Sequence, residues 1–215
     1  PGVGDFARSY DATVRGESSH FVWLNRSKES LTLDLKHPDA PEVVRRLLER
    51  ADVFVQNLAP GATGRLGLAA EALRAAYSRL VVCEISGYGS TGPYRNRKAY
   101  DLLVQAEAGL LSITGTPEEP AKVGISVADI AAGMYAYSGV LTALLMRERT
   151  GKGTALEVSM LEALGEWMSY PVYYGVYGGT APQRSGARHA VIAPYGPFAG
   201  GDGDVVYLGV QNEPE

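Results

Sequence analysis

Short apolar segments alternate with helix-like segments in the first 86 residues, and this alternation restricts the fold more than any other feature of the sequence. The apolar segments are residues 30–35, 52–56 and 80–85, and helical patterns run from about 37 to 50 and from about 69 to 77. The first helical pattern has proline and acidic residues in its first turn, which are common helix-start signals. Short strands separated by helices pair in parallel. The sequence therefore predicts an α/β fold, a Rossmann-like parallel sheet layer with flanking helices.

The pattern changes after Pro93. Helices with apolar faces are expected over residues 100–111, 129–148 and 156–170. From Pro171 the sequence is rich in Tyr, Gly and Pro without a regular period, until a strand pattern at 205–210. Such a stretch is typical of a long connection or a subunit contact. We therefore expect a large domain over residues 1–150, and a long helix with a connecting segment over residues 151–215.

Composition excludes several function classes. The chain is 46% hydrophobic and 20% charged, which is ordinary for a soluble globular protein, and its net charge of −4 argues against a nucleic-acid surface. The apolar runs are far shorter than a membrane-spanning helix requires, so no membrane protein is expected. The single cysteine, Cys83, lies in a buried-strand pattern, so we expect a core residue and a reducing, cytoplasmic location.

Asp129 stands among small and apolar residues at the expected start of the helix over residues 129–148. No basic residue lies within sequence reach to pair with it, and apolar surroundings make a carboxylate costly to keep charged. One interpretation is an N-cap, which the spacing alone favours. The other is a nucleophilic carboxylate whose anion is stabilised by the helix dipole and the free N–H groups of the first turn.

Five sequence blocks decide between these interpretations. They cover residues 25–36, 51–61, 98–101, 126–135 and 149–153. In this order they resemble the family III CoA-transferases, and the resemblance extends from Pro1 to Gln211. It implies the family's fold, an interlocked homodimer, and Asp129 as the catalytic nucleophile. It also implies a chain that is an internal portion of a longer transferase, without the first strand and helix of the large domain.

The resemblance places Tyr100 and Asp101 in the active-site pocket beside the nucleophile. From their position alone they are equally a core aromatic and a cap at the start of a helix. The racemases of this family have histidine where Tyr100 stands and use it as a base for the α-proton. Tyrosine, with a pKa near 10, is a poor base at neutral pH, which favours a transferase over a racemase. Asp101 either tunes the nucleophile by repulsion or forms hydrogen bonds in the pocket.

Coenzyme A carries phosphates, so its site requires cations and hydrogen-bond donors. The resemblance implies that six residues line this site: Leu33, Lys36, Asn57, Leu58, Arg65 and Lys98. For each of the three cations the alternative is a solvated surface charge. Arg184 and His189 are candidates either to meet a substrate carboxylate or to brace a loop. Coenzyme A is expected as a substrate, with no tightly bound cofactor, and the three histidines lack the spacing of a metal site.

The sequence thus predicts a CoA-transferase that moves CoA between an acyl-CoA and a small carboxylic acid, with dicarboxylates favoured. The expected intermediates are an aspartyl anhydride and an aspartyl-CoA thioester. The alternatives are an α-methylacyl-CoA racemase-like enzyme and a non-catalytic CoA-binding fragment. Expected partners are the acyl-CoA, the acid and a second copy of the chain, with neither nucleic acid nor a membrane. Tyrosines of the segment after residue 169 are expected at the dimer interface: Tyr170, Tyr173, Tyr174 and Tyr177.

Overall fold

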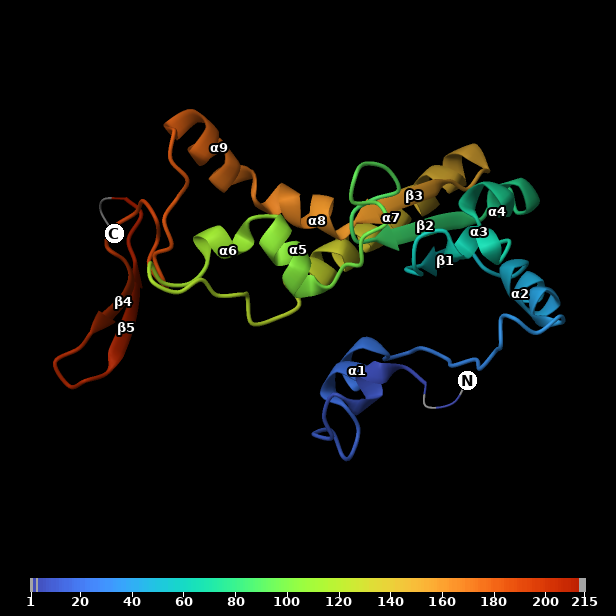
Figure 1. Ribbon diagram of the computed structural model, residues 1–215, viewed down its shortest axis with the longest axis horizontal. Coiled ribbons are helices and arrows are strands. Elements are labelled where there is room, and N and C mark those ends of the chain that lie inside the picture. Colours follow the sequence, from blue (N-terminus) through green and yellow to red (C-terminus); the bar gives the residue numbers. More distant parts are fainter. Residues whose placement is uncertain (1, 3, 213–215) are drawn as a thin grey trace. The chain divides into compact units, whose positions relative to one another are not determined.

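The computed structural model describes residue 2 and residues 4–212, and the chain divides into two compact units, residues 1–50 and 51–215 (Figure 1). The first unit contains the 3-10 helix η1 (Phe6–Ser9), α1 (Ser19–Leu24) and α2 (Ala40–Leu48). Asp11 fixes the start of α1, because its carboxylate accepts hydrogen bonds from the N–H (3.0 Å) and the hydroxyl (2.8 Å) of Ser19. The helix predicted over residues 37–50 is confirmed as α2.

Residues 30–35 do not form a strand, so this prediction was wrong. The segment is irregular, and Leu31 and Leu35 are 60% and 40% exposed. A strand requires a hydrogen-bonded neighbour. Among the described residues of the chain, none pairs with this segment. The alternation of apolar and polar residues alone could not reveal the missing partner.

The second unit contains a three-stranded parallel sheet in the order β1 (Val53–Gln56), β2 (Val81–Ser86) and β3 (Ala155–Ser159). The central strand β2 is buried most deeply, since its first three residues have no exposed surface. β2 lies between the apolar strands β1 and β3, and buried strands of a parallel sheet are short apolar runs. The strand predictions for residues 52–56 and 80–85, which rest on such runs, are therefore confirmed. The Rossmann-like parallel layer expected from the sequence is therefore present, with a different third strand.

The third strand occupies the start of the helix that was expected over residues 156–170, so that prediction was wrong in its first part. Residues 155–159 alternate between more exposed and more buried positions, as a strand does. Ser159 ends the strand and caps α8 (Met160–Trp167), because its side-chain oxygen accepts the N–H of Glu162 at 3.1 Å. The predicted helix is confirmed over α8, and its last two residues, Ser169 and Tyr170, lie in the next helix.

The long helix α7 (Val127–Thr150) packs against β2 and β3, and Figure 1 shows it running along the sheet. Its buried face is made mainly of alanines, which allow close packing. By length and composition alone, with a mean hydropathy of 1.3, α7 could cross a membrane, so the expectation of no such run was wrong. One face of α7 packs on the sheet, α5 and α8, as a helix that covers a sheet in an α/β unit does, and a third of its apolar window is buried.

The remaining helices are short. They are α3 (Ala62–Arg65), α4 (Ala70–Ala76), α5 (Asp101–Glu107), α6 (Leu110–Ile113) and α9 (Ser169–Gly178). Gly109, at a φ of 82°, divides the helix expected over residues 100–111 into α5 and α6. After α9, an antiparallel hairpin is formed by β4 (Tyr195–Ala199) and β5 (Val205–Gly209). The strand pattern at 205–210 is confirmed as β5.

Candidate active site

Asp129 lies in the first turn of α7. The helix begins two residues earlier than expected, with Ser126 at the N-cap position, so the N-cap interpretation of Asp129 was wrong. Within residues 4–212, the carboxyl of Asp129 forms no hydrogen bond and no ion pair. A carboxylate in the first turn interacts favourably with the helix dipole, and here its oxygens keep their lone pairs available.

The pKa of Asp129 is raised above the ordinary aspartate value. The larger cause is desolvation, because surrounding protein atoms displace water from the carboxyl even though the residue keeps exposed surface. The smaller cause is repulsion by the carboxylate of Asp101. The neighbouring Ala128 belongs to a buried apolar cluster that also contains Val104 and Leu164. A partly desolvated carboxylate that is still accessible and accepts no hydrogen bond from the described residues is suited to nucleophilic attack.

Asp101 caps α7 from a different helix. It is the first residue of α5, and its Oδ1 accepts the backbone N–H of Ala128 at 2.8 Å. That N–H is one of those at the start of α7 without a partner inside the helix. The other oxygen, Oδ2, accepts a hydrogen bond from Nε2 of Gln105 at 2.6 Å. The carboxylate of Asp101 therefore forms hydrogen bonds and also repels a negative charge on Asp129, and its place in an active-site pocket stays a prediction.

Tyr100 occupies the N-cap position of α5, and 65% of the residue is exposed. This exposure contradicts the alternative of a core aromatic. Cys83, in contrast, is fully buried in β2, and burial raises the pKa of its thiol, so it is a core residue as expected and not a poised thiolate.

The structure distributes the six expected CoA-site residues over both units. In the first unit, Leu33 is half-buried within the irregular segment of residues 30–35, and the exposed Lys36 directly follows it. In the second unit, Asn57 and Leu58 follow β1 directly, and Arg65 ends α3. Lys98 lies elsewhere in the second unit, lining a hollow that also includes Tyr88, Arg97, Leu103, Ala106 and Glu107. The three cations all have exposed side chains.

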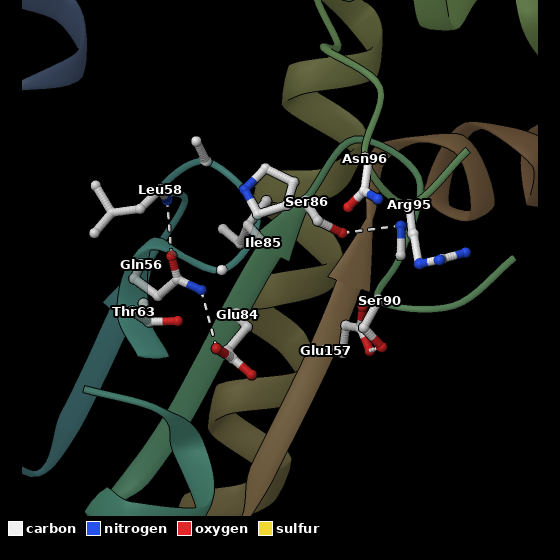
Figure 2. Close-up of a pocket in the computed structure, with 14 residues that line it drawn as sticks. Gln56, Leu58, Thr63, Glu84, Ile85, Ser86, Ser90, Arg95, Asn96 and Glu157 are labelled. Carbon is white, nitrogen blue, oxygen red and sulfur yellow. Dashed lines mark hydrogen bonds between the residues drawn. The ribbon is translucent and has the colours of Figure 1, made fainter. Parts of the chain in front are cut away.

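A cavity of about 300 Å³ opens at the carboxyl ends of β1 and β2, and Figure 2 shows its lining. The side chain of Gln56 forms two hydrogen bonds on one side of this cavity. Its Nε2 donates to the carboxylate of Glu84 at 3.0 Å, and its Oε1 accepts the N–H of Leu58 at 2.7 Å. Ligands of open α/β sheets bind outside the carboxyl ends of the strands, so the location is typical of a nucleotide-like ligand.

Of the six residues expected at the CoA site, Leu58 lines this cavity, and the other five are not part of its lining. The lining side chains with no such prediction come from the sheet edge and from the loop after β2, namely Gln56, Glu84, Ser86, Ser90 and Glu157. Arg95 and Asn96, which also line the cavity, belong to a basic cluster over residues 95–98 that the sequence shows to be compatible with a small anionic ligand. The signal that could have found this edge is the glycine- and serine-rich run over residues 86–92, directly after a strand.

Arg184 and His189 brace loops. The guanidinium of Arg184 donates to the carbonyl oxygens of Thr116 and Pro117 at 2.7 and 2.8 Å. Nδ1 of His189 accepts two backbone N–H groups of the following loop at 3.2 and 3.1 Å. Of the two roles considered for these residues, the structure shows the brace.

Comparison with known proteins matches the profile of CoA-transferase family III to residues 1–215. The chain belongs to CoA-transferase family III. This family III chain is 37% identical over 204 residues to an acetyl-CoA:oxalate CoA-transferase from Acetobacter aceti, covering 94% of the chain and 52% of the relative. It is 34% identical over 209 residues to the human succinyl-CoA:glutarate CoA-transferase, covering 96% of the chain and 48% of the relative.

The family fold is supported by a solved structure. A CAIB/BAIF family protein from Brucella suis is 35% identical and superimposes with a TM-score of 0.84, covering 93% of this chain and 55% of that protein. The family III chain spans about half the length of the curated relatives that it matches. The resemblance drawn from the five sequence blocks is thus confirmed.

Proposed function

We propose that this family III chain carries the nucleophile of a CoA-transferase, Asp129, which moves CoA from an acyl-CoA to a small carboxylic acid. The observation that carries the proposal is the exposed and only partly desolvated carboxyl of Asp129, free of hydrogen bonds among the described residues, at the start of α7. Such a group is suited to serve as a covalent carrier, because it attacks a thioester without first losing a hydrogen-bond partner.

The proposed reaction has four steps in which bonds and charges balance. The Asp129 carboxylate attacks the donor thioester carbonyl and the C–S bond breaks. CoA departs as the thiolate, and an aspartyl-acyl anhydride remains on the protein. The thiolate then attacks the aspartyl carbonyl, which releases the donor acid and forms an aspartyl-CoA thioester. The acceptor carboxylate attacks this thioester and expels the thiolate again. Attack of the thiolate on the acceptor's acyl carbon gives the new acyl-CoA and restores the carboxylate of Asp129.

We propose CoA as a substrate bound by residues 1–150, which would form most of the large domain, with no tightly bound cofactor. The cavity at the carboxyl ends of β1 and β2, with Leu58 in its lining, supports a CoA site on this edge of the sheet. A dicarboxylic acceptor is supported by the relatives, since those named above act on oxalate and on glutarate. A reducing, cytoplasmic location suits the single buried thiol of Cys83.

An activity assay tests the proposed function. Full-length protein is incubated with succinyl-CoA or acetyl-CoA and a panel of mono- and dicarboxylic acids, and new acyl-CoA is detected by mass spectrometry. We expect transfer to a dicarboxylate. The same incubation in deuterated water tests the racemase alternative: α-proton exchange without transfer would contradict the proposal. Binding of CoA with neither reaction would favour the alternative of a non-catalytic, CoA-binding role.

Replacing Lys36 or Arg65 by alanine is expected to raise the KM for acyl-CoA by about 10-fold with a smaller change in kcat, because a phosphate contact made equally in ground and transition states affects binding alone. Steady-state kinetics of the two variants measure the effect. Arg74→Ala is the matched control, since Arg74 is an exposed cation on α4 outside the expected CoA set. Equal KM values for all three variants would show that Lys36 and Arg65 do not hold CoA.

The protein is expected to be a homodimer, in which two interlocked subunits bury more than about 2,000 Å². Support comes from the tyrosines of α9, which expose between 43% and 83% of their surface within one chain. Two pairs of these rings lie next to each other along the helix, Tyr170 with Tyr174 edge to face and Tyr173 with Tyr177 in a tilted arrangement. Analytical ultracentrifugation of full-length protein at micromolar concentration measures the state. A stable monomer would contradict the prediction.

A further inference from the structure

Gln105 is one of the largest fully buried side chains among the described residues, and it is polar. It lies in α5, a helix that packs against both α7 and α8. Burying an amide is costly unless its hydrogen bonds are made. Both ends are bonded here: Nε2 donates to Oδ2 of Asp101 at 2.6 Å, and Oε1 accepts the N–H of Val123 at 3.0 Å.

The directions of these hydrogen bonds fix the orientation of the amide. The backbone N–H of Val123 can only donate, so the oxygen of Gln105 must face it and the amino group must face Asp101. Asp101 uses its other oxygen for the N–H of Ala128 at 2.8 Å. A continuous connection therefore runs from Val123 through Gln105 and Asp101 to Ala128. These hydrogen bonds link the two ends of residues 123–128, the six-residue segment that includes the first two residues of α7.

Asp129 follows this segment directly, and among the described residues its own carboxyl has no hydrogen bond that would orient it. Its position therefore depends on the backbone of the first turn of α7. We infer that Gln105 is a positioning residue: through Asp101 and Val123 it holds the start of α7 so that Asp129 faces the substrate. The role assigned to Gln105 rests on the proposed function of Asp129 as nucleophile.

Ionisable groups on every packed element bear on a pH test of Gln105. Asp101 on α5 and Asp129 on α7 interact with its network, and Lys122 lies at the other end of it, where its Nζ donates to the carbonyl oxygen of Val123 at 3.0 Å. Glu107 on α5 pairs with Arg97 at 3.4 Å, and Glu162 on α8 accepts the Ser159 hydroxyl at 2.9 Å. The remaining acid of α8 is Glu166, and α6 carries no ionisable side chain.

Two substitutions separate positioning from packing. Gln105→Leu keeps much of the volume and removes both hydrogen bonds, so kcat is expected to fall about 10- to 100-fold with little change in the KM for acyl-CoA. Gln105→Glu keeps the acceptor for Val123 and can donate to Asp101 only while the introduced carboxyl is protonated. Its kcat relative to wild type is therefore expected to rise as the pH is lowered from 8 to 6, whereas the ratio for Gln105→Leu stays constant.

The controls are Gln183→Leu, the same change in an exposed loop, and Leu73→Val, a change in a buried residue of α4. One contradicting result is that Gln105→Leu loses no more kcat than Leu73→Val when the two variants lose the same Tm. If, in addition, the kcat of Gln105→Glu relative to wild type does not change with pH, Gln105 acts by packing alone and the inference is wrong.

Hydrogen exchange of the Ala128 amide provides a readout that needs no activity. It is expected to be at least about ten times faster in Gln105→Leu than in Leu73→Val, because the capping carboxylate loses its support. Unchanged exchange would overturn the inference. Absence of transfer by the wild-type protein would refute the proposed function instead, and the exchange measurement would still decide whether Gln105 holds this turn.

Discussion

Replacing Asp129 with alanine or asparagine is expected to lower kcat of CoA transfer by more than about 1,000-fold, because neither side chain can form the covalent link to the acyl group. CoA binding should remain nearly unchanged, since the residues proposed to hold CoA are elsewhere. Isothermal titration and steady-state kinetics measure the two effects separately. The matched control is Asp202→Asn, in the exposed turn between β4 and β5, which should keep full activity. Substantial turnover by Asp129→Asn would refute the nucleophile assignment.

Loss of activity in Asp129→Asn should not reflect loss of stability. The folded-state pKa of Asp129 is raised, so ionisation of this carboxyl costs stability as the pH rises through that pKa. The asparagine variant is therefore expected to be at least as stable as wild type at pH 7, with the difference disappearing in acid. For the same reason kcat/KM should fall on the acid side at a pH above the ordinary aspartate value of 3.8. Thermal unfolding and rate measurements across pH test both expectations.

Gly153→Ala is expected to destabilise the protein by about 3 kcal/mol or more. Gly153 joins α7 to β3, and a Cβ there would overlap the carbonyl oxygen of Leu80 and lie 2.5 Å from its carbonyl carbon. These are backbone atoms at the start of β2. They cannot move easily, because the next two N–H groups of β2 are hydrogen-bonded to the carbonyl oxygens of Asp52 (3.1 Å) and Thr154 (2.9 Å).

The control for this prediction is Gly165→Ala in α8, where an added Cβ meets no atom within 4 Å. Alanine has the higher helix propensity, so this variant is expected to gain about 0.5–1 kcal/mol. Urea unfolding of the two variants and wild type gives the free energies. If Gly153→Ala remained within about 0.5 kcal/mol of wild type, the close packing of this corner would be in doubt.

The sequence predicted the elements whose patterns are local. β1 and β2 are short apolar runs bounded by turns, and both are present. The segment over residues 30–35 shows the same kind of alternation but lacks a neighbouring strand among the described residues, which sequence pattern cannot reveal. β3 was hidden because five alternating residues run directly into a helix, so that helical spacing dominated the longer window.

The candidate site, like the fold, was predictable only where its signals are local in the sequence. Asp129 was recognised by its apolar neighbours and by the family blocks, whereas the start of α7 was misplaced by two residues. Its cap is supplied by Asp101, a residue 27 positions away in the sequence. Gln105 was missed entirely, since a glutamine in an amphipathic helix is usually a surface residue. Only the packed structure shows that its amide is buried and bonded at both ends.

The most direct test of the central claim, that Asp129 carries the transferred group, is mass spectrometry of protein treated with hydroxylamine during turnover. Hydroxylamine converts an aspartyl anhydride or an aspartyl-CoA thioester into a stable hydroxamate. The predicted result is a hydroxamate on the peptide that contains Asp129, formed only in the presence of acyl-CoA and absent from Asp129→Asn. Transfer that proceeds with no adduct at Asp129, or with the adduct on another carboxylate, would contradict the claim.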